Sequence, residues 1–367
     1  MKDSIRRGQF SILVFFMPLI FKISTLPSYI AGRAGTDSIF LMATILGLEF
    51  IHLIVILRII NAGGVRRLEE LYGKKRVFFV TLPLFFTCLA RLLAYGVKVA
   101  DYVTYFLFYN VDHFGIKTVL FLAVFYVAIK GLRGIGRLAE LGLAFFPLII
   151  FLGVVFGKTD LNLQYVLPLG TISAEEFMGC FSSLLFWVTD FTPFLFVDIA
   201  EPTLEMKKKK PFPYVSVACL LCLIALEAIY VVFFSNYGEA APIIDHVFAR
   251  LAAFNVVTTQ VGSLEWPTIV MWLIFSLLYL SLNAYAGGRA VSELIPDFRI
   301  SVGIIAAAAI ILSQTVVKET AGSMELALSP FRYVAIGVDV GVSIIMLLLL
   351  TLSKKHRHTE IVNETQL

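Results

Sequence analysis

The chain has 367 residues, of which 59% are hydrophobic and 15% are charged, and its formal net charge is +4. Apolar windows long enough to cross about 30 Å of hydrocarbon recur from end to end, which excludes a soluble globular protein. We predict an all-α integral membrane protein. We read residues 1–367 as a single domain, because no polar segment is long enough to form another.

Hydropathy predicts about ten transmembrane helices. In chain order they cover approximately residues 10–30, 38–60, 77–109, 117–130, 138–156, 177–200, 213–235, 266–286, 300–317 and 333–352. The first five spans fall within 10–156 and the last five within 177–352. The first apolar run follows MKDSIRRGQ directly and lacks a cleavage pattern, so we expect a span there and not a signal peptide. Lysines and arginines gather in the loops on the N-terminal side, which predicts that both termini are cytoplasmic.

Two predicted spans are interrupted by residues that do not suit a continuous apolar helix. In span one Lys22 lies between Pro18 and Pro27, and a charge at that depth costs about 3 kcal/mol. Span six contains the run TDFTP at 189–193. Interrupted helices at matching positions of two halves indicate a ligand site near the middle of the membrane, because unwound backbone exposes groups that can bind a ligand. From these spans we predict as ligand contacts Phe21, Lys22, Ile23, Ser24, Thr25, Thr189, Asp190 and Thr192.

Polar residues also recur along one face of span three. Arg91, Tyr95, Lys98, Tyr102 and Tyr105 follow one another at steps of four, three, four and three, which is the spacing of one helix face. We expect this face to line a cavity, and Arg91 and Tyr95 complete the predicted ligand site. For Lys98 the alternative is that it marks the outer membrane interface, beside a belt of aromatic residues.

Four further ionisable residues at membrane depth are candidates for ion or proton coupling: Glu49, His52, Glu227 and Asp339. Glu49 and His52 are three residues apart on span two, and a histidine beside a carboxylate is suited to a proton relay. The alternative is that these two side chains satisfy one another, or pair with Arg58 or with a neighbouring helix. Glu227 and Asp339 each need a partner or a proton.

Lys22 itself has three interpretations. It pairs with Asp190 in a structural ion pair that occupies the space of a ligand's charges, or it is a fixed internal cation in the place of a bound sodium ion, or it binds an anionic group of the ligand. We favour the first interpretation.

The chain shows no motif for catalysis or metal binding. HExxH, GxSxG, a Walker-type loop and zinc-type cysteine and histidine spacing are all absent from the sequence, and the four cysteines lie within or beside apolar segments. We therefore predict no enzymatic activity, no metal and no cofactor. The basic residues are accounted for by the membrane topology, so we expect no nucleic-acid partner.

Several strings, in their order along the chain, resemble one known family. They are LPSYIAGRAGTDSI after span one, NAGGVRRLEELYGKK, IKGLRGIGRLAEL between spans four and five, and NLQYVLPLG before span six. Together they resemble the B-subunit family of spore germinant receptors, which belongs to the amino acid-polyamine-organocation superfamily of transporters. The chain departs from that family in span one, where LIFKISTLP replaces a glycine-rich stretch, and after span three, where NVDHFGIK replaces a common Thr-Pro pair.

The resemblance implies a five-plus-five inverted-repeat fold with a small-molecule pocket between spans one, three, six and eight. It implies a subunit that senses a small polar nutrient such as an amino acid, beside A-type and C-type partner subunits, in the spore inner membrane of an endospore-forming bacterium. Two alternatives stay open at this point. One is a free-standing permease for an amino acid or amine, coupled to protons or sodium, and the other is a membrane scaffold subunit that binds no ligand.

Overall fold

The computed structural model describes residues 3–24, 26–107, 113–156, 162–200, 212–244, 247, 265–292, 294–295, 297–317 and 320–364. Within these residues the named elements are all helices, and the single β-bridge joins Ile5 to Ile199. The α-helices are α1 (Arg7–Lys22), α2 (Leu26–Ala34), α3 (Ser38–Asn61), α4 (Gly64–Tyr72), α5 (Lys74–Leu107), α6 (His113–Ile129), α7 (Gly131–Phe156), α8 (Ala174–Ser183), α9 (Phe212–Tyr237), α11 (Glu265–Val291), α12 (Phe298–Thr315), α13 (Thr320–Leu328) and α14 (Phe331–Glu364). The short 3₁₀ helices include η3 (Leu185–Thr189) and η4 (Thr192–Phe196).

The helices make this a multi-pass membrane protein. Six helices or helix pairs of the described part are long and apolar enough to cross a bilayer, and two bent pairs raise the number to eight if each pair is one span. The bends are 113° between α6 and α7, and 55° between α8 and the 3₁₀ segment that follows it. The prediction of an all-α membrane protein is confirmed, and length and composition support six to eight of the ten predicted spans.

Both interruptions predicted from the sequence are breaks in the structure. The predicted span one, residues 10–30, covers most of α1 and the first part of α2, and α1 ends at Lys22 while α2 begins at Leu26. Pro27 is the second residue of α2, where its missing N–H leaves no helical bond unmade. In span six α8 gives way to η3 and η4, and Asp190 lies between these two short helices.

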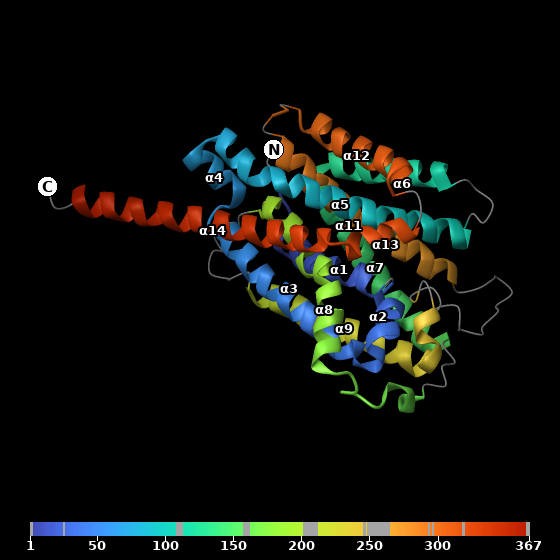
Figure 1. The fold of residues 1–367 in the computed structure, drawn as a ribbon. Helices are drawn as coiled ribbons and strands as arrows, with labels where there is room; N and C mark the ends of the chain where they lie inside the picture. The colour runs from blue at the N-terminus through green and yellow to red at the C-terminus, as the bar shows by residue number, and fades with distance from the viewer. Residues whose placement is uncertain are drawn as a thin grey trace.

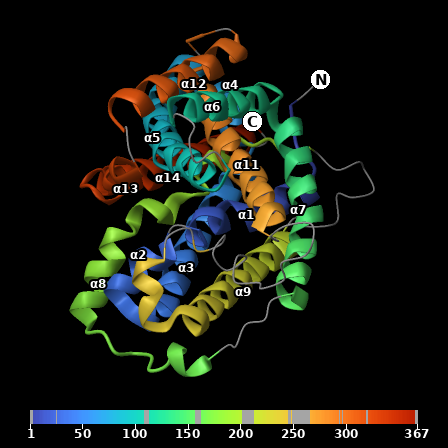
Figure 2. The ribbon, with the colours of Figure 1, turned by 90° about the vertical axis from the view of Figure 1, so that its right-hand side faces the viewer.

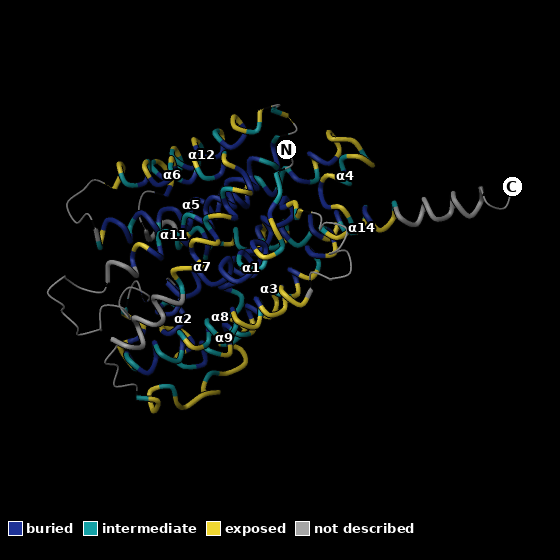
Figure 3. Tube along the Cα trace, turned by 180° about the vertical axis from the view of Figure 1, so that it is seen from behind, coloured by how far each residue is buried: buried dark blue, intermediate teal, exposed yellow. Residues whose placement is uncertain are grey.

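A central pair of helices carries the core. α5 packs along α11, α1 packs against α9 and α7, and α14 and α3 both pack on η3. In Figures 1 and 2, α6 and α12 lie together on one side of the central pair, and α2, α8 and α9 lie on the other. The inner helices are mostly buried, whereas exposed residues gather on outward faces such as those of α3 and α12 (Figure 3). Large apolar side chains on these faces, such as Phe40 on α3 and Ile311 on α12, suit contact with lipid.

One polar anchor fixes the approach to α8. Asp37, at the start of α3, accepts hydrogen bonds from the backbone N–H groups of Gly170, Thr171 and Ile172, and from the hydroxyl of Thr171. These bonds tie the loop before the broken span six to the helix that follows the broken span one. The sequence analysis did not identify this contact, because the two segments are more than a hundred residues apart.

The packing of α11 against α12 depends on glycine. A Cβ added at Gly288 would lie 2.6 Å from Val302 Cγ2 and 3.2 Å from the backbone N and Cα of Val302, so the two helices would have to move apart. Overpacking of this kind costs about 1–3 kcal/mol. We therefore expect Gly288→Ala to lower the thermal unfolding midpoint of the purified protein.

Gly337→Ala is the matched control, because Gly337 lies on the exposed face of α14 and an added Cβ there meets nothing within 4 Å. Alanine is the better helix former by about 1 kcal/mol, so this control should unfold no earlier than wild type. Equal midpoints for the two variants would contradict the close approach of α11 and α12.

Candidate functional site

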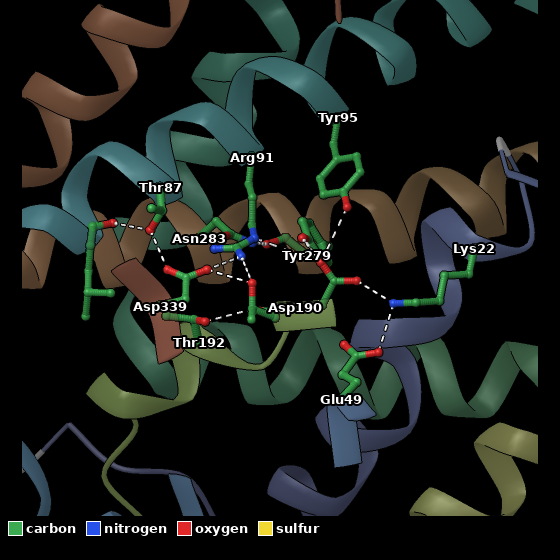
Figure 4. Close-up of polar contacts among 12 residues, drawn as sticks. Lys22, Glu49, Thr87, Arg91, Tyr95, Asp190, Thr192, Tyr279, Asn283 and Asp339 are labelled. Atoms are coloured by element: carbon green, nitrogen blue, oxygen red, sulfur yellow. Dashed lines mark hydrogen bonds and ion pairs between the residues drawn. The ribbon is translucent and has the colours of Figure 1, made fainter. Parts of the chain in front are cut away.

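The lysine at the end of α1 is fully buried and holds two carboxylates. Lys22 Nζ lies 2.7 Å from Asp190 Oδ2 and 2.9 Å from Glu49 Oε2 (Figure 4). The three side chains are at most 2% exposed. Lys22 therefore pairs with Asp190 as favoured from the sequence, and Glu49 is a second partner. Of the two interpretations of Glu49, a proton relay with His52 or a pair with another group, the structure shows a pair with a neighbouring helix, α1.

The break in span one explains why a lysine is placed here. Lys22 is the last residue of α1, where the carbonyl groups of the final turn lack helical partners and the helix dipole favours a positive charge. Tyr230 on α9 donates its hydroxyl to the backbone oxygen of Lys22 at 3.1 Å. The side chain reaches across to Asp190, which lies at the corresponding break of span six.

Arg91 forms the second half of the site with Asp339. Its Nη2 donates to Asp339 Oδ2 and, at 2.6 Å, to Thr189 Oγ1. Thr189 in turn donates to Asp339 Oδ2 at 2.7 Å, and Thr87 donates to Asp339 Oδ1 at 2.8 Å. Asp339, whose partner the sequence could not identify, is thus held by one cation and two hydroxyl groups.

The two halves are joined at Asp190. Arg91 Nε lies 4.0 Å from Asp190 Oδ1, and Tyr279 donates its hydroxyl to the same oxygen at 2.8 Å. The hydroxyl of Tyr95 is 3.4 Å from that oxygen, while its ring stacks on Phe21 with 3.8 Å between ring centroids. A continuous polar chain therefore runs from Glu49 on α3 to Asp339 on α14, across α1, η3 and α5.

Tyr279 is a site residue that the sequence analysis missed. A signal for it exists: Trp272, Ser276, Tyr279 and Asn283 follow one another at steps of four, three and four along α11. This is the same spacing that identified the polar face of α5. The stripe was overlooked because it consists of uncharged residues within the apolar window of span eight.

The charges of the site do not cancel. It holds two cations, Lys22 and Arg91, and three carboxylates, those of Glu49, Asp190 and Asp339. With all five ionised the cluster carries one surplus negative charge, and a buried uncompensated charge is costly. The site therefore has the capacity to take up one proton or one cationic group.

His52 lies at the Asp339 end of this cluster. Ser343 donates its hydroxyl hydrogen to the backbone oxygen of Asp339 at 2.7 Å, so Ser343 Oγ acts as the acceptor toward His52 Nε2 at 3.0 Å. This assigns the hydrogen of the neutral ring to Nε2. Nδ1 is then a buried proton acceptor, and it has no hydrogen-bond partner among the residues described.

The other predicted residues make local contacts or lie apart. Ile23 caps α1, the Ser24 hydroxyl donates to the Ile20 backbone, and the Thr192 hydroxyl donates to the Thr189 backbone. Thr25 lies outside the described residues. Both carboxylate oxygens of Glu227 on α9 lack a hydrogen-bond partner within the described part of the chain.

Removal of Lys22 tests its place in the network. We expect Lys22→Met to destabilise the protein by about 3–5 kcal/mol, because it leaves two buried carboxylates without their cation. Addition of Asp190→Asn removes one of those charges, so the double variant should lose less stability than the sum of the losses of the two single variants. Unfolding in detergent measures both effects.

Lys75→Met is the control for the loss of a lysine, since Lys75 is exposed at the start of α5. It should leave stability unchanged. If the effects of Lys22→Met and Asp190→Asn on the free energy of unfolding were strictly additive, the two side chains would not interact.

In the ranges that the structure covers, no group of three or more His, Cys, Asp or Glu side chains is placed to hold a metal ion. The arrangement suits exchange of charged hydrogen bonds with a small polar molecule.

Comparison of the chain with protein-family models gives no match, and comparison with curated proteins gives none.

Proposed function

We propose that the chain is a B-type subunit of a spore germinant receptor, with a transporter fold and a ligand site between the breaks of spans one and six. The observation that carries this proposal is the ion-pair network that Lys22 forms with Glu49 and Asp190 at those breaks. The ligand class is a small polar nutrient such as an amino acid. The proposal includes A-type and C-type partner subunits, cytoplasmic termini and the spore inner membrane.

The packing of the helices supports a five-plus-five inverted repeat of ten spans. The first half is α1 with α2, α3, α5, α6 and α7, and the second is α8 with η3 and η4, α9, α11, α12 and α14. When each span of one half is exchanged for the corresponding span of the other half, the contact of α1 with α9 becomes the contact of η3 with α3, which the structure also has. In the same way, the contact of α11 with α7 corresponds to that of α5 with α14, and the contact of α11 with α12 corresponds to that of α5 with α6. A pairing that survives this exchange is what two related halves would produce.

A zwitterion matches the charges at the breaks. Its carboxylate would be bound by Lys22 or Arg91, and its ammonium group by Glu49 or Asp190. Without ligand, Lys22 is paired with Asp190 and Arg91 with Asp339, so the ligand has to replace the protein's own ion pairs. Because Lys22 belongs to α1 and Asp190 to the break of span six, that replacement changes the contact between the two broken spans. This change is the signal we propose for the partner subunits.

A second candidate function is a proton-coupled permease for an amino acid or amine. The observations that favour it are the surplus carboxylate of the site and His52 Nδ1, which has no hydrogen-bond partner in the part of the chain that the structure describes. One proton taken up with the ligand would neutralise the cluster, and its release on the other side would reset it. The scaffold alternative is favoured by the complete burial of Lys22 between two carboxylates.

Thermal stabilisation by ligands tests the proposal. Purified wild type is screened against amino acids, amines, sugars and nucleosides, and we expect one class to raise the unfolding midpoint. Asp190→Asn should abolish the shift, while Glu175→Gln, at an exposed position of α8, should retain it. No shift from any class, together with failure of Lys22→Ala and Asp190→Asn to fold, would favour the scaffold.

Flux measurements separate the receptor from the permease. In proteoliposomes that receive the ligand found by the screen from the outside, the receptor proposal expects binding with no net uptake. A permease is expected to accumulate ligand when the outside is more acidic than the inside, and to lose this response in His52→Gln. Accumulation driven by the pH gradient would overturn the receptor proposal in favour of the permease.

A further inference from the structure

A large cavity lies at the end of the bundle where α1 begins. Its volume is about 710 Å³, within the range of small-molecule sites. The walls are the start of α1, the turn from α3 into α4, residues 195–200 at the end of η4 and just after it, and Arg289 near the end of α11. We call this cavity the vestibule. It contains none of the residues of the network around Lys22.

The described residues that line the vestibule carry a surplus of positive charge. Among them are four arginines, Arg7, Arg66, Arg67 and Arg289, and two acidic residues, Glu70 and Asp198. Glu70 is shared by Arg66 and Arg67, at 3.5 and 3.1 Å. One carboxylate between two guanidinium groups leaves donors of both groups for another acceptor, since each guanidinium carries five N–H donors.

Backbone N–H groups add further hydrogen-bond donors to the walls of the vestibule. Gly63 and Gly64 both have positive φ, 107° and 63°, and they turn the chain sharply from α3 into α4. Gly64, Val65 and Arg66 form the first turn of α4, where N–H groups have no acceptor within the helix, and all three line the vestibule. A positive helix end therefore meets the arginines in the same cavity.

We infer that the vestibule binds an anion that carries phosphate groups, supplied either by a soluble phosphate compound or by the headgroup of an acidic lipid. Guanidinium groups from α4 and α11 line the same cavity, and arginine binds phosphate oxygens in a planar paired geometry. The volume exceeds that of a single phosphate, which leaves room for further groups on the anion. This site goes beyond the proposed function and does not depend on it.

The walls of the vestibule connect it to both broken spans. Ile5, just before α1, receives a hydrogen bond at its backbone oxygen from Ala200 N at 2.8 Å, and its own N–H donates to Asp198 O at 3.0 Å. The start of span one is thus joined to the end of span six at the wall of the cavity. An anion bound there would hold together the two spans whose breaks carry Lys22 and Asp190.

Binding is tested on the full purified chain with two probes. Pyrophosphate is titrated in uncharged detergent at constant ionic strength, with chloride as the reference anion, and binding is followed by calorimetry and by the unfolding midpoint. The lipid probe is reconstitution into phosphatidylcholine discs with and without phosphatidylglycerol. We expect at least one probe to bind or stabilise wild type. A response to pyrophosphate alone identifies a soluble anion, and a response to phosphatidylglycerol alone identifies a lipid headgroup.

Charge-matched variants assign the response to the vestibule. Arg289→Gln and Arg67→Gln should each weaken binding about tenfold or more, the equivalent of one charge-assisted hydrogen bond. Arg299→Gln removes the same charge from an exposed position at the start of α12 and should bind as wild type does. Absence of any wild-type response to both probes would overturn the inference even if a variant fails to fold. If Arg299→Gln lost as much binding as the vestibule variants, net charge alone would account for the response, and this result would overturn the inference as well.

Discussion

The structure depends on one constraint, the compensation of charges that lie where water cannot reach them. Five charged residues in the interior are at most 1% exposed to solvent: Lys22, Glu49, Arg91, Asp190 and Asp339. Each of them would be strongly unfavourable alone in a low-dielectric interior, and each is close to a group of opposite charge. Because these five residues come from α1, α3, α5, the break of span six and α14, satisfying their charges fixes where all these elements lie.

The broken helices make that arrangement possible. A continuous helix bonds its own backbone groups and presents only side chains, whereas a break exposes a helix end with its unpaired carbonyls. Lys22 lies at such an end, and the hydroxyl of Tyr230 satisfies its carbonyl oxygen. The interruption thus provides a suitable local field for the lysine and also frees its side chain to reach the second broken span.

The buried network has two parts, one around Lys22 and one around Arg91 and Asp339, which meet in one short segment. Thr189 belongs to the part around Arg91 and Asp339, and its neighbour Asp190 belongs to the part around Lys22. A movement of this segment therefore alters both parts together, which is the kind of coupling a two-state element requires. The vestibule borders the end of the same broken span, so the two sites lie along one structural element.

Much of this could be predicted from the sequence, because it follows from local composition. Apolar windows predict helices, and the helices are there. Lys22 with its flanking prolines and the run TDFTP predicted interruptions, and the chain breaks at both. The pairing of Lys22 with Asp190 could also be inferred, because few acidic residues lie in a matching interrupted span. The vestibule arginines, in contrast, look in the sequence like ordinary loop charges of a membrane topology.

What the sequence by itself determined is therefore the class of protein, its helices, and the residues at which two of them break, since each of these depends on neighbours along the chain. The tertiary structure decided the partners: Glu49 for Lys22 in place of His52, Arg91 for Asp339, Tyr279 for Asp190, and Asp37 for the loop at Gly170. These contacts join residues tens to hundreds of positions apart. Which carboxylate meets which cation is set by how the helices pack, and packing depends on all of the chain at once.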